Sequence, residues 1–170
     1  MLFRSRSRLT ITRLIGQVDR VIVSLDLLMK RTVKEMPAVH EASGHIATIP
    51  GFGELTSAFL GHCFTRVPYS TSDAVVAAAG LDPRPDDSGL REGRRRLSKR
   101  GPAEARRLLF NCARSAAQMK IWRPYYEAQL AKGLSKTAAA MVLARKMLRV
   151  AFAVYKHRQP FNPLLIGART

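Results

Sequence analysis

Acidic residues are scarce in this sequence: 12 Asp and Glu side chains stand against 29 Lys and Arg in 170 residues. The formal net charge of +17 is a source of self-repulsion that a polyanion or an acidic partner would screen. Hydrophobic residues still make up 46% of the chain, which is enough apolar surface to favour folding over disorder. The balance of charge therefore points first to nucleic acid as a partner.

Cysteine and long apolar runs are scarce as well. Cys63 and Cys112 lie far apart with no metal-ligand pattern beside them, and the four histidines lack ligand spacing, so neither a disulfide framework nor a metal site is predicted. No stretch reaches ~18 uninterrupted apolar residues, and the basic start lacks a sustained apolar segment and a cleavage site. We therefore expect a cytoplasmic protein with no membrane contact and no cofactor in this chain.

The first part of the chain has the apolar spacing of a coiled coil. Apolar residues recur in alternating steps of three and four at Ile11, Leu14, Val18, Val21, Leu25 and Leu28. The spacing predicts a helix from about Thr10 to Glu35, ended by Pro37. Its apolar seam either packs back on the same domain or mediates homo-oligomer formation or docking on another domain. We divide the chain into a coiled-coil helix and arm (1–36) and a helical domain (37–170).

A glycine-containing turn follows, with the sequence Ile49-Pro50-Gly51-Phe52-Gly53, just before a helical stripe. Two glycines that bracket one apolar residue resemble the hairpin of a helix-hairpin-helix element. In such an element the backbone N–H groups of Gly51 and Gly53 would face a DNA phosphate at a helix N-terminus. The alternative is a plain tight turn.

Further helices are predicted from periodicity and capping residues. Ser70 to Asp73 offer N-caps for a short helix through Ala79 that Gly80 closes; further helices follow at 102–119, at 122–130 (a short one) and after Ser135. The apolar residues expected to face inward from the 102–119 helix are Leu108, Leu109, Cys112, Ala113 and Ala116. Trp122 and the tyrosines at helical positions are interpreted as core or interface. No segment shows the alternation of a strand, so the fold class is all-α.

Periodicity disappears between Gly80 and Gly101, in a stretch too long and too charged for a routine connection. Asp86 and Asp87 are adjacent carboxylates in a Pro-rich turn, which is typical of solvated loop residues rather than of a metal site. The basic residues in and after this stretch are predicted to contact nucleic acid through its backbone, without reading bases. They are Arg94, Arg95, Arg96, Lys99, Arg100, Arg106 and Arg107.

Three blocks in fixed order carry a resemblance to a known family. They are Ile49 to Gly53 with Thr56 and Ala58; Gly80-Leu81-Asp82-Pro83 to Ser88-Gly89 with Ser98-Lys99-Arg100-Gly101; and Tyr125-Tyr126 to Gly133 with Ala144-Arg145-Lys146. Over residues 10–163 the chain resembles the C-terminal domain of the IS-one-ten family of insertion-sequence transposases, relatives of the pilin-gene invertases.

The resemblance implies an enzyme of several parts. Members have an N-terminal domain like the Holliday-junction resolvases with acidic residues that bind a divalent metal, then a coiled coil, then a domain like this one; we expect the first domain to be absent here. They recombine DNA directed by a guide RNA, and the serine of an SG motif, here Ser88, attacks a phosphodiester. From the residues alone, Ser88 is an ordinary turn residue.

Two functions follow from these expectations. In the first, the chain is the DNA-binding and serine-nucleophile part of a transposase, inactive without an acidic domain. In the second, it is a remnant that binds nucleic acid and transfers no strand. A histone-like architectural protein would explain the charge but not the glycine, SG and SKRG blocks.

Overall fold

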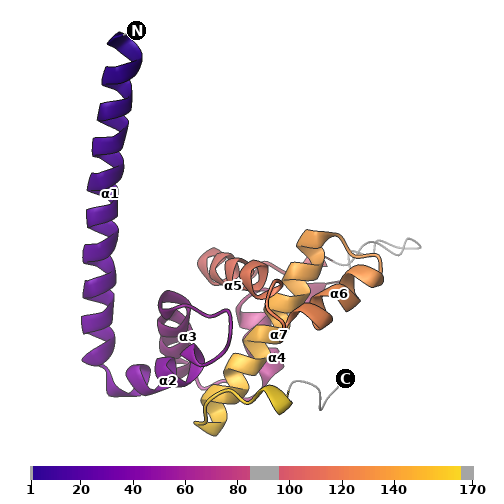
Figure 1. The fold of residues 1–170 in the computed structure, drawn as a ribbon. Helices are drawn as coiled ribbons and strands as arrows, with labels where there is room; N and C mark the ends of the chain where they lie inside the picture. Colours follow the sequence, from indigo (N-terminus) through magenta and orange to yellow (C-terminus); the bar gives the residue numbers. More distant parts are fainter. Residues whose placement is uncertain (1, 85–95, 166–170) are drawn as a thin grey trace.

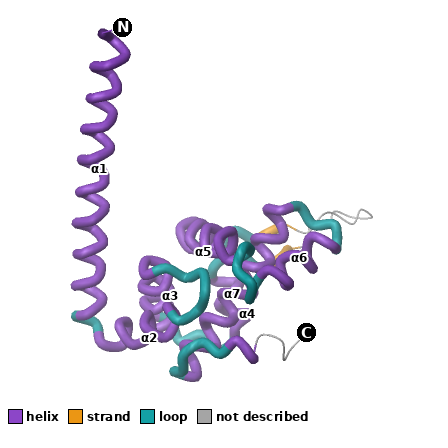
Figure 2. The backbone as a smooth tube through the Cα atoms, in the orientation of Figure 1, coloured by secondary structure: helices purple, strands orange, loops and turns teal. Residues whose placement is uncertain are grey.

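The computed structural model describes residues 2–84 and 96–165. This part of the chain is helical, which confirms the all-α prediction, with one small hairpin of two strands (Figures 1 and 2). Its elements are α1 (Leu2–Lys34), α2 (Pro37–Ala47), α3 (Glu54–Arg66), α4 (Ser72–Ala78), β1 (Pro83–Arg84), β2 (Arg96–Leu97), α5 (Ala103–Ala116), α6 (Arg123–Ala131), α7 (Lys136–His157) and a short 3-10 helix η1 (Pro163–Leu165).

The long N-terminal helix predicted from the heptad spacing is present as α1. It projects from the body and meets the rest of the fold at its C-terminal end, beside α2 (Figure 1). The six seam residues between Ile11 and Leu28 are 54–60% exposed, so the seam does not pack back on this domain. A helix in a folded protein gains most of its stability by packing its apolar face against other elements. In α1 that face has no partner within the described residues.

Helix α2 was not predicted from the sequence. Pro37 ends the first helix as expected, but it also occupies the first turn of the next one, where the missing N–H and the fixed φ of proline are favourable. Val39, Ala42 and Ile46 recur at steps of three and four and are buried, largely against α3. Helices α2 and α3 therefore form a helical hairpin whose connection is the glycine-containing turn.

Helix α7 is the centre of the body, because it contacts α2, α3, α4, α5 and α6. The Ser135 side chain caps its N-terminus by accepting a hydrogen bond from the Ala138 amide, as predicted. Small buried residues on α7, such as Ala140 and Ala144, let the neighbouring helices approach closely. From α5, the predicted inward face of Leu108, Leu109, Cys112, Ala113 and Ala116 is buried.

The stretch between α4 and α5 begins and ends in an antiparallel hairpin that sequence periodicity did not reveal. Pro83 pairs with Leu97 and Arg84 with Arg96. Strands of two residues are too short to show apolar alternation. Beyond the strands, the Ser98 amide donates to the Asp82 carbonyl (2.9 Å) and the Lys99 amide donates to the Gly80 carbonyl (3.2 Å).

Two glycines bring the ends of this stretch into backbone contact. Gly80 has a φ of +68°, and a Cβ there would lie 2.8 Å from the Gly101 nitrogen. A Cβ on Gly101 would overlap the carbonyl oxygen of Ala78. Arg106, on α5, donates from Nη1 to the Gly101 carbonyl (2.5 Å) and reaches the Ala79 carbonyl (3.5 Å). The backbones at Gly80 and Gly101 therefore touch directly, and the guanidinium group of Arg106 holds them together.

This arrangement predicts that Arg106→Ala destabilises the fold by about 1–3 kcal/mol, because carbonyl oxygens in a half-buried contact lose a charged donor. Arg107→Ala, one residue along, is the control: it removes only an exposed ion pair with Glu104 and should change stability little. Urea unfolding of the three proteins measures the difference. Equal midpoints for both variants would contradict a structural role of Arg106.

Candidate nucleic-acid interface

The residues of the predicted interface fall into three groups. Ser88, Arg94 and Arg95 lie outside the described residues. Arg96, Lys99 and Arg100 lie on the returning arm of the hairpin, and all three side chains are exposed. Lys99 has a φ of +54°, in the left-handed region, directly before the backbone contact at Gly101. The hairpin thus brings three of the predicted cations together at the surface.

Arg106 and Arg107 have partners inside the chain. Arg106 is half-buried and holds the carbonyls described above. Arg107 is exposed and donates to Glu104 from Nε (2.8 Å) and Nη2 (2.5 Å). These hydrogen bonds, and then the charge of Arg107, lower the pKa of Glu104. The assignment of Arg106 and Arg107 to nucleic acid stays a prediction.

The glycine-containing turn between α2 and α3 is anchored to the core. Gly51 has a φ of +98°, and a Cβ there would lie 2.9 Å from the Ala116 Cβ and 3.2 Å from the Met147 Cε. Phe52 is buried, and the fully buried Trp122 donates from Nε1 to the Pro50 carbonyl (2.7 Å). Packing on α5 and α7 therefore explains Gly51 without a ligand.

Gly53 differs from Gly51 in both exposure and surroundings. It is exposed, a Cβ there would meet no atom within 4 Å, and it precedes the first residue of α3 as an N-cap without a side-chain hydrogen bond. The first N–H groups of a helix lack intrahelical acceptors and carry partial positive charge. Of the two predicted glycines, only Gly53 lies at an exposed helix start, and its contact with phosphate stays a prediction.

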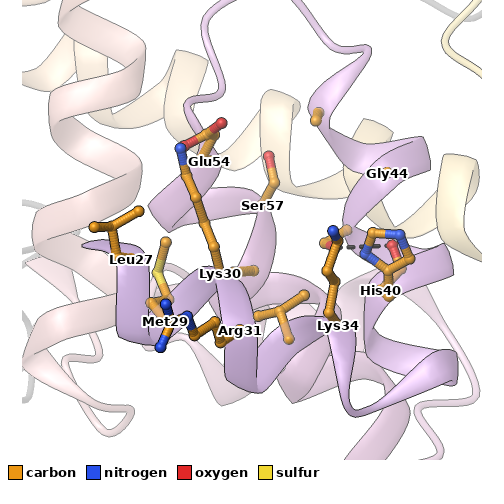
Figure 3. Close-up of a pocket in the computed structure, with 13 residues that line it drawn as sticks. Leu27, Met29, Lys30, Arg31, Lys34, His40, Gly44, Glu54 and Ser57 are labelled. Atoms are coloured by element: carbon orange, nitrogen blue, oxygen red, sulfur yellow. Dashed lines mark hydrogen bonds and ion pairs between the residues drawn. The ribbon is translucent and has the colours of Figure 1, made fainter. Parts of the chain in front are cut away.

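A cavity of about 380 Å³ lies next to this helix start, between the C-terminal end of α1, α2 and α3 (Figure 3). Lys30 of α1 reaches across it to Glu54, with Nζ 2.7 Å from Oε2. The hydrogen bond and the charge of Glu54 raise the pKa of Lys30. Arg31 and Lys34 also line the cavity, so two further cations lie near the ion pair at the start of α3.

A second polar cluster, at the base of the hairpin, was missed by sequence reasoning. The Ser98 hydroxyl donates to Oδ1 of Asp82, and Nε of Arg84 lies 3.8 Å from Oδ2. Arg145 of α7 interacts electrostatically with Asp82 and with Tyr125 of α6. These residues come from four separate stretches of the chain. The sequence signal was that Asp82, Ser98, Tyr125 and Arg145 belong to the quoted motif blocks.

Neither cysteine is in a reactive setting. Cys112 is buried, with its Sγ 3.2 Å from the Thr56 hydroxyl oxygen, and burial raises the pKa of the half-buried Cys63. Within residues 2–84 and 96–165, no three His, Cys, Asp or Glu side chains lie close enough together to bind a metal ion. No described helix is long and apolar enough to cross a bilayer.

Comparison with known proteins identifies a family whose sequences match this chain. The sequence profile of the family described as Transposase IS116/IS110/IS902 matches residues 43–127, from α2 to the middle of α6. The matched segment includes the glycine-containing turn, the hairpin and the backbone contact at Gly80 and Gly101.

Individual relatives agree with this match. A protein of insertion element IS116 from Streptomyces clavuligerus is 27% identical over 157 residues, which cover 89% of this chain and 39% of the relative. The transposase of insertion sequence IS1328 from Yersinia enterocolitica is 31% identical over 135 residues, 74% of this chain and 39% of the relative. The pilin gene-inverting protein of Moraxella bovis is 25% identical over 148 residues, 83% of this chain and 45% of the relative.

The chain thus spans about two fifths of the length of the relatives that it matches. Because the family profile covers half of the chain and includes both of its glycine-dependent features, the chain belongs to the IS116/IS110/IS902 family of transposases.

Proposed function

We propose that this chain is the DNA-binding part of a transposase that breaks and rejoins DNA, and that it carries the nucleophile of the reaction. The observation behind the proposal is the hairpin closed by Gly80 and Gly101, which lies inside the segment matched by the family profile and presents Arg96, Lys99 and Arg100 at its surface. The relatives are named as a transposase and as a gene-inverting protein, activities that both rearrange DNA.

Phosphate contacts would hold the DNA in place. Lys99 and Arg100 are exposed and have no acidic partner among the described residues, which suits them to a phosphate backbone. Gly53, with the free N–H groups of α3 and the cations of the neighbouring cavity, is a second contact point. Contacts of this type position DNA and carry no base code. The proposal therefore assigns sequence choice to a guide RNA.

The nucleophile of the proposed reaction is Ser88. Its hydroxyl gives up its proton to a base and Oγ attacks the phosphorus of a DNA phosphodiester. A P–O bond to a deoxyribose oxygen breaks, a phosphoserine ester forms, and the released oxygen takes up a proton from an acid. The ester conserves the bond energy needed to rejoin the strand. Arg94, Arg95 and Arg96 would neutralise charge on the attacked phosphate.

The chain supplies only part of this chemistry. Within the described residues, no group of three His, Cys, Asp or Glu side chains could hold a metal ion. We place the metal and the acid–base groups in an acidic domain outside this sequence.

The α1 seam provides a surface for a second copy, because a partner helix would bury the apolar residues that α1 leaves exposed. The rival function, a remnant without strand transfer, shares the DNA contacts and lacks the covalent step.

The DNA contacts predict strongly salt-dependent binding. Log affinity of the full chain for duplex DNA should fall against log salt with a slope of several units, and Lys99→Ala with Arg100→Ala should reduce that slope by about two, since each phosphate contact contributes ~0.9. The matched control, Arg66→Ala with Lys156→Ala, removes the same charge from exposed positions on α3 and α7. A DNA affinity that does not change with salt, or equal slopes for both double variants, would contradict the assignment of Lys99 and Arg100 to phosphate contacts.

The covalent step predicts a separation of binding from chemistry. The chain alone should not cleave DNA, because a serine hydroxyl gains little without a base. Supplied with the acidic domain and the guide RNA, Ser88→Ala should lose protein–DNA adducts on denaturing gels and keep its DNA affinity. Ser98→Ala is the control, since the Ser98 hydroxyl is held by Asp82. Adducts that persist in Ser88→Ala and vanish in Ser98→Ala would show that the nucleophile is Ser98 and not Ser88. A complete system without adducts would favour the remnant.

The seam predicts self-association. Val18→Asp with Leu25→Asp should lower the mass measured by sedimentation, because two charges would have to be buried between apolar helices. Thr12→Asp with Val23→Asp adds the same charge on the face of α1 away from the seam and should leave the mass unchanged. A parent chain that sediments as a monomer contradicts the assignment.

A further inference from the structure

The guanidinium group of Arg145, on α7, lacks part of the hydrogen bonding that a buried charged group requires. Its Nε atom is buried and has no hydrogen-bond partner among the described residues. The residue as a whole is half-buried, so part of it remains accessible to solvent. A desolvated charge without a hydrogen bond is costly. Such a group in a folded protein calls for an explanation through a ligand or a structural partner.

The nearest carboxylate does not supply the partner. Asp82 accepts a hydrogen bond from Ser98 at Oδ1 and has Nε of Arg84 3.8 Å from Oδ2. Asp82 interacts with Arg145 through its charge, without a hydrogen bond to the buried Nε. Burial first, and then the charge of Arg149, lower the pKa of the Arg145 guanidinium; Tyr125 and Asp82 raise it by less. The surroundings therefore disfavour the charge that arginine keeps at every physiological pH.

Further cations next to Arg145 add to the excess of positive charge around it. Arg149, one turn further along α7, is held by Asp73 of α4, with its Nη2 2.8 Å from Oδ1. Lys146 lies over the ring of Tyr125, with Nζ 5.9 Å from the ring centroid. Among the described residues, Asp82 and Asp73 thus interact with three arginines, Arg84, Arg145 and Arg149. An additional anion would satisfy Arg145 and relieve the repulsion between it and Arg149.

The position of the cluster indicates which anion. Arg145 interacts with Asp82, and Asp82 directly precedes β1, so the cluster lies at the base of the hairpin whose other arm carries Lys99 and Arg100. A guanidinium group matches the paired oxygens of a phosphate with two parallel N–H donors. A DNA backbone held by Lys99 and Arg100 would have its neighbouring phosphates within reach of this cluster.

We infer that Arg145 is the anchor of a phosphate-binding subsite at the base of the hairpin, made by α7 and the α4–β1 connection, and that its ligand is a backbone phosphodiester of DNA. The subsite rests on the proposed DNA-binding function and adds a contact from a motif block, Ala144 to Lys146, to which that function assigned no role. Lys146 and Arg149 flank the same phosphate, and Asp82 keeps Arg84 and Ser98 in place beside it.

Two properties of Arg145→Met separate a phosphate ligand from a structural role. Methionine keeps the apolar stem and removes the charge, so without DNA the melting temperature should stay the same or rise. DNA affinity at low salt should fall roughly tenfold, and the slope of log affinity against log salt should become shallower by about one. Arg145→Lys should recover part of the affinity, because it restores charge without the two-pronged geometry. The control, Arg66→Met on α3, should change affinity less than twofold.

The remaining outcomes overturn the subsite. A large drop in melting temperature for Arg145→Met with unchanged DNA affinity would make Arg145 a structural residue of the hairpin base. Inorganic phosphate that raises the melting temperature of the parent but not of the variant, with equal DNA affinity for both, would identify a free-phosphate site. Loss of affinity for structured RNA alone would reassign the ligand to RNA. A parent that binds no DNA would instead remove the proposed function itself, which the salt titration of the parent reveals independently of Arg145.

Discussion

The backbone contact between Gly80 and Gly101 is the constraint on which the rest of the functional surface depends. It closes a long excursion of the chain at its base, where loop-closure entropy opposes bringing the two ends together. No side chain fits between the two segments, and Arg106 holds their carbonyls from α5. Since α4 and α5 both pack on α7, the same contact fixes where the hairpin emerges from the helical body.

The cations of this chain divide by what surrounds them. Arg106 and Arg107 are satisfied by carbonyls and by Glu104, and they contribute to the fold. Lys99 and Arg100 are exposed on the hairpin, and Arg145 is half-buried beneath it without a hydrogen bond from its Nε to a described residue. The net charge of +17 is spread over the whole chain, but the exposed cations of the hairpin lie where the family profile and the backbone geometry coincide. That coincidence is the physical basis for placing DNA at the hairpin.

Sequence reasoning succeeded where the determinant is local and periodic. The heptad spacing from Ile11 to Leu28 predicted α1, the Ser135 cap predicted the start of α7, and the inward face of α5 followed from its apolar stripe. It missed α2 because Pro37 was interpreted only as a stop signal, although proline is also favoured in a first helical turn.

Sequence reasoning was incomplete where the determinant is a contact between distant segments. Gly51 was predicted to free a backbone N–H for phosphate, which stays a prediction, but the sequence could not show that Ala116 and Met147 leave no room for a side chain there. Arg106 was counted with the nucleic-acid cations because nothing local shows its hydrogen bonds to Ala79 and Gly101. Arg145 was quoted in a motif without a role, because its environment is assembled from α6, α7 and the hairpin.

The most direct test of the account is a map of where DNA protects the backbone. Hydrogen exchange of the full chain, measured with and without duplex DNA, reports on the amides of Ser98 and Lys99, which donate to Asp82 and Gly80 across the hairpin base. Slower exchange there and in the turn of α7 around Arg145, with little change at the C-terminal end of α7, is the expected result. Protection confined to α1, with the hairpin amides unchanged, would contradict the placement of DNA at the hairpin.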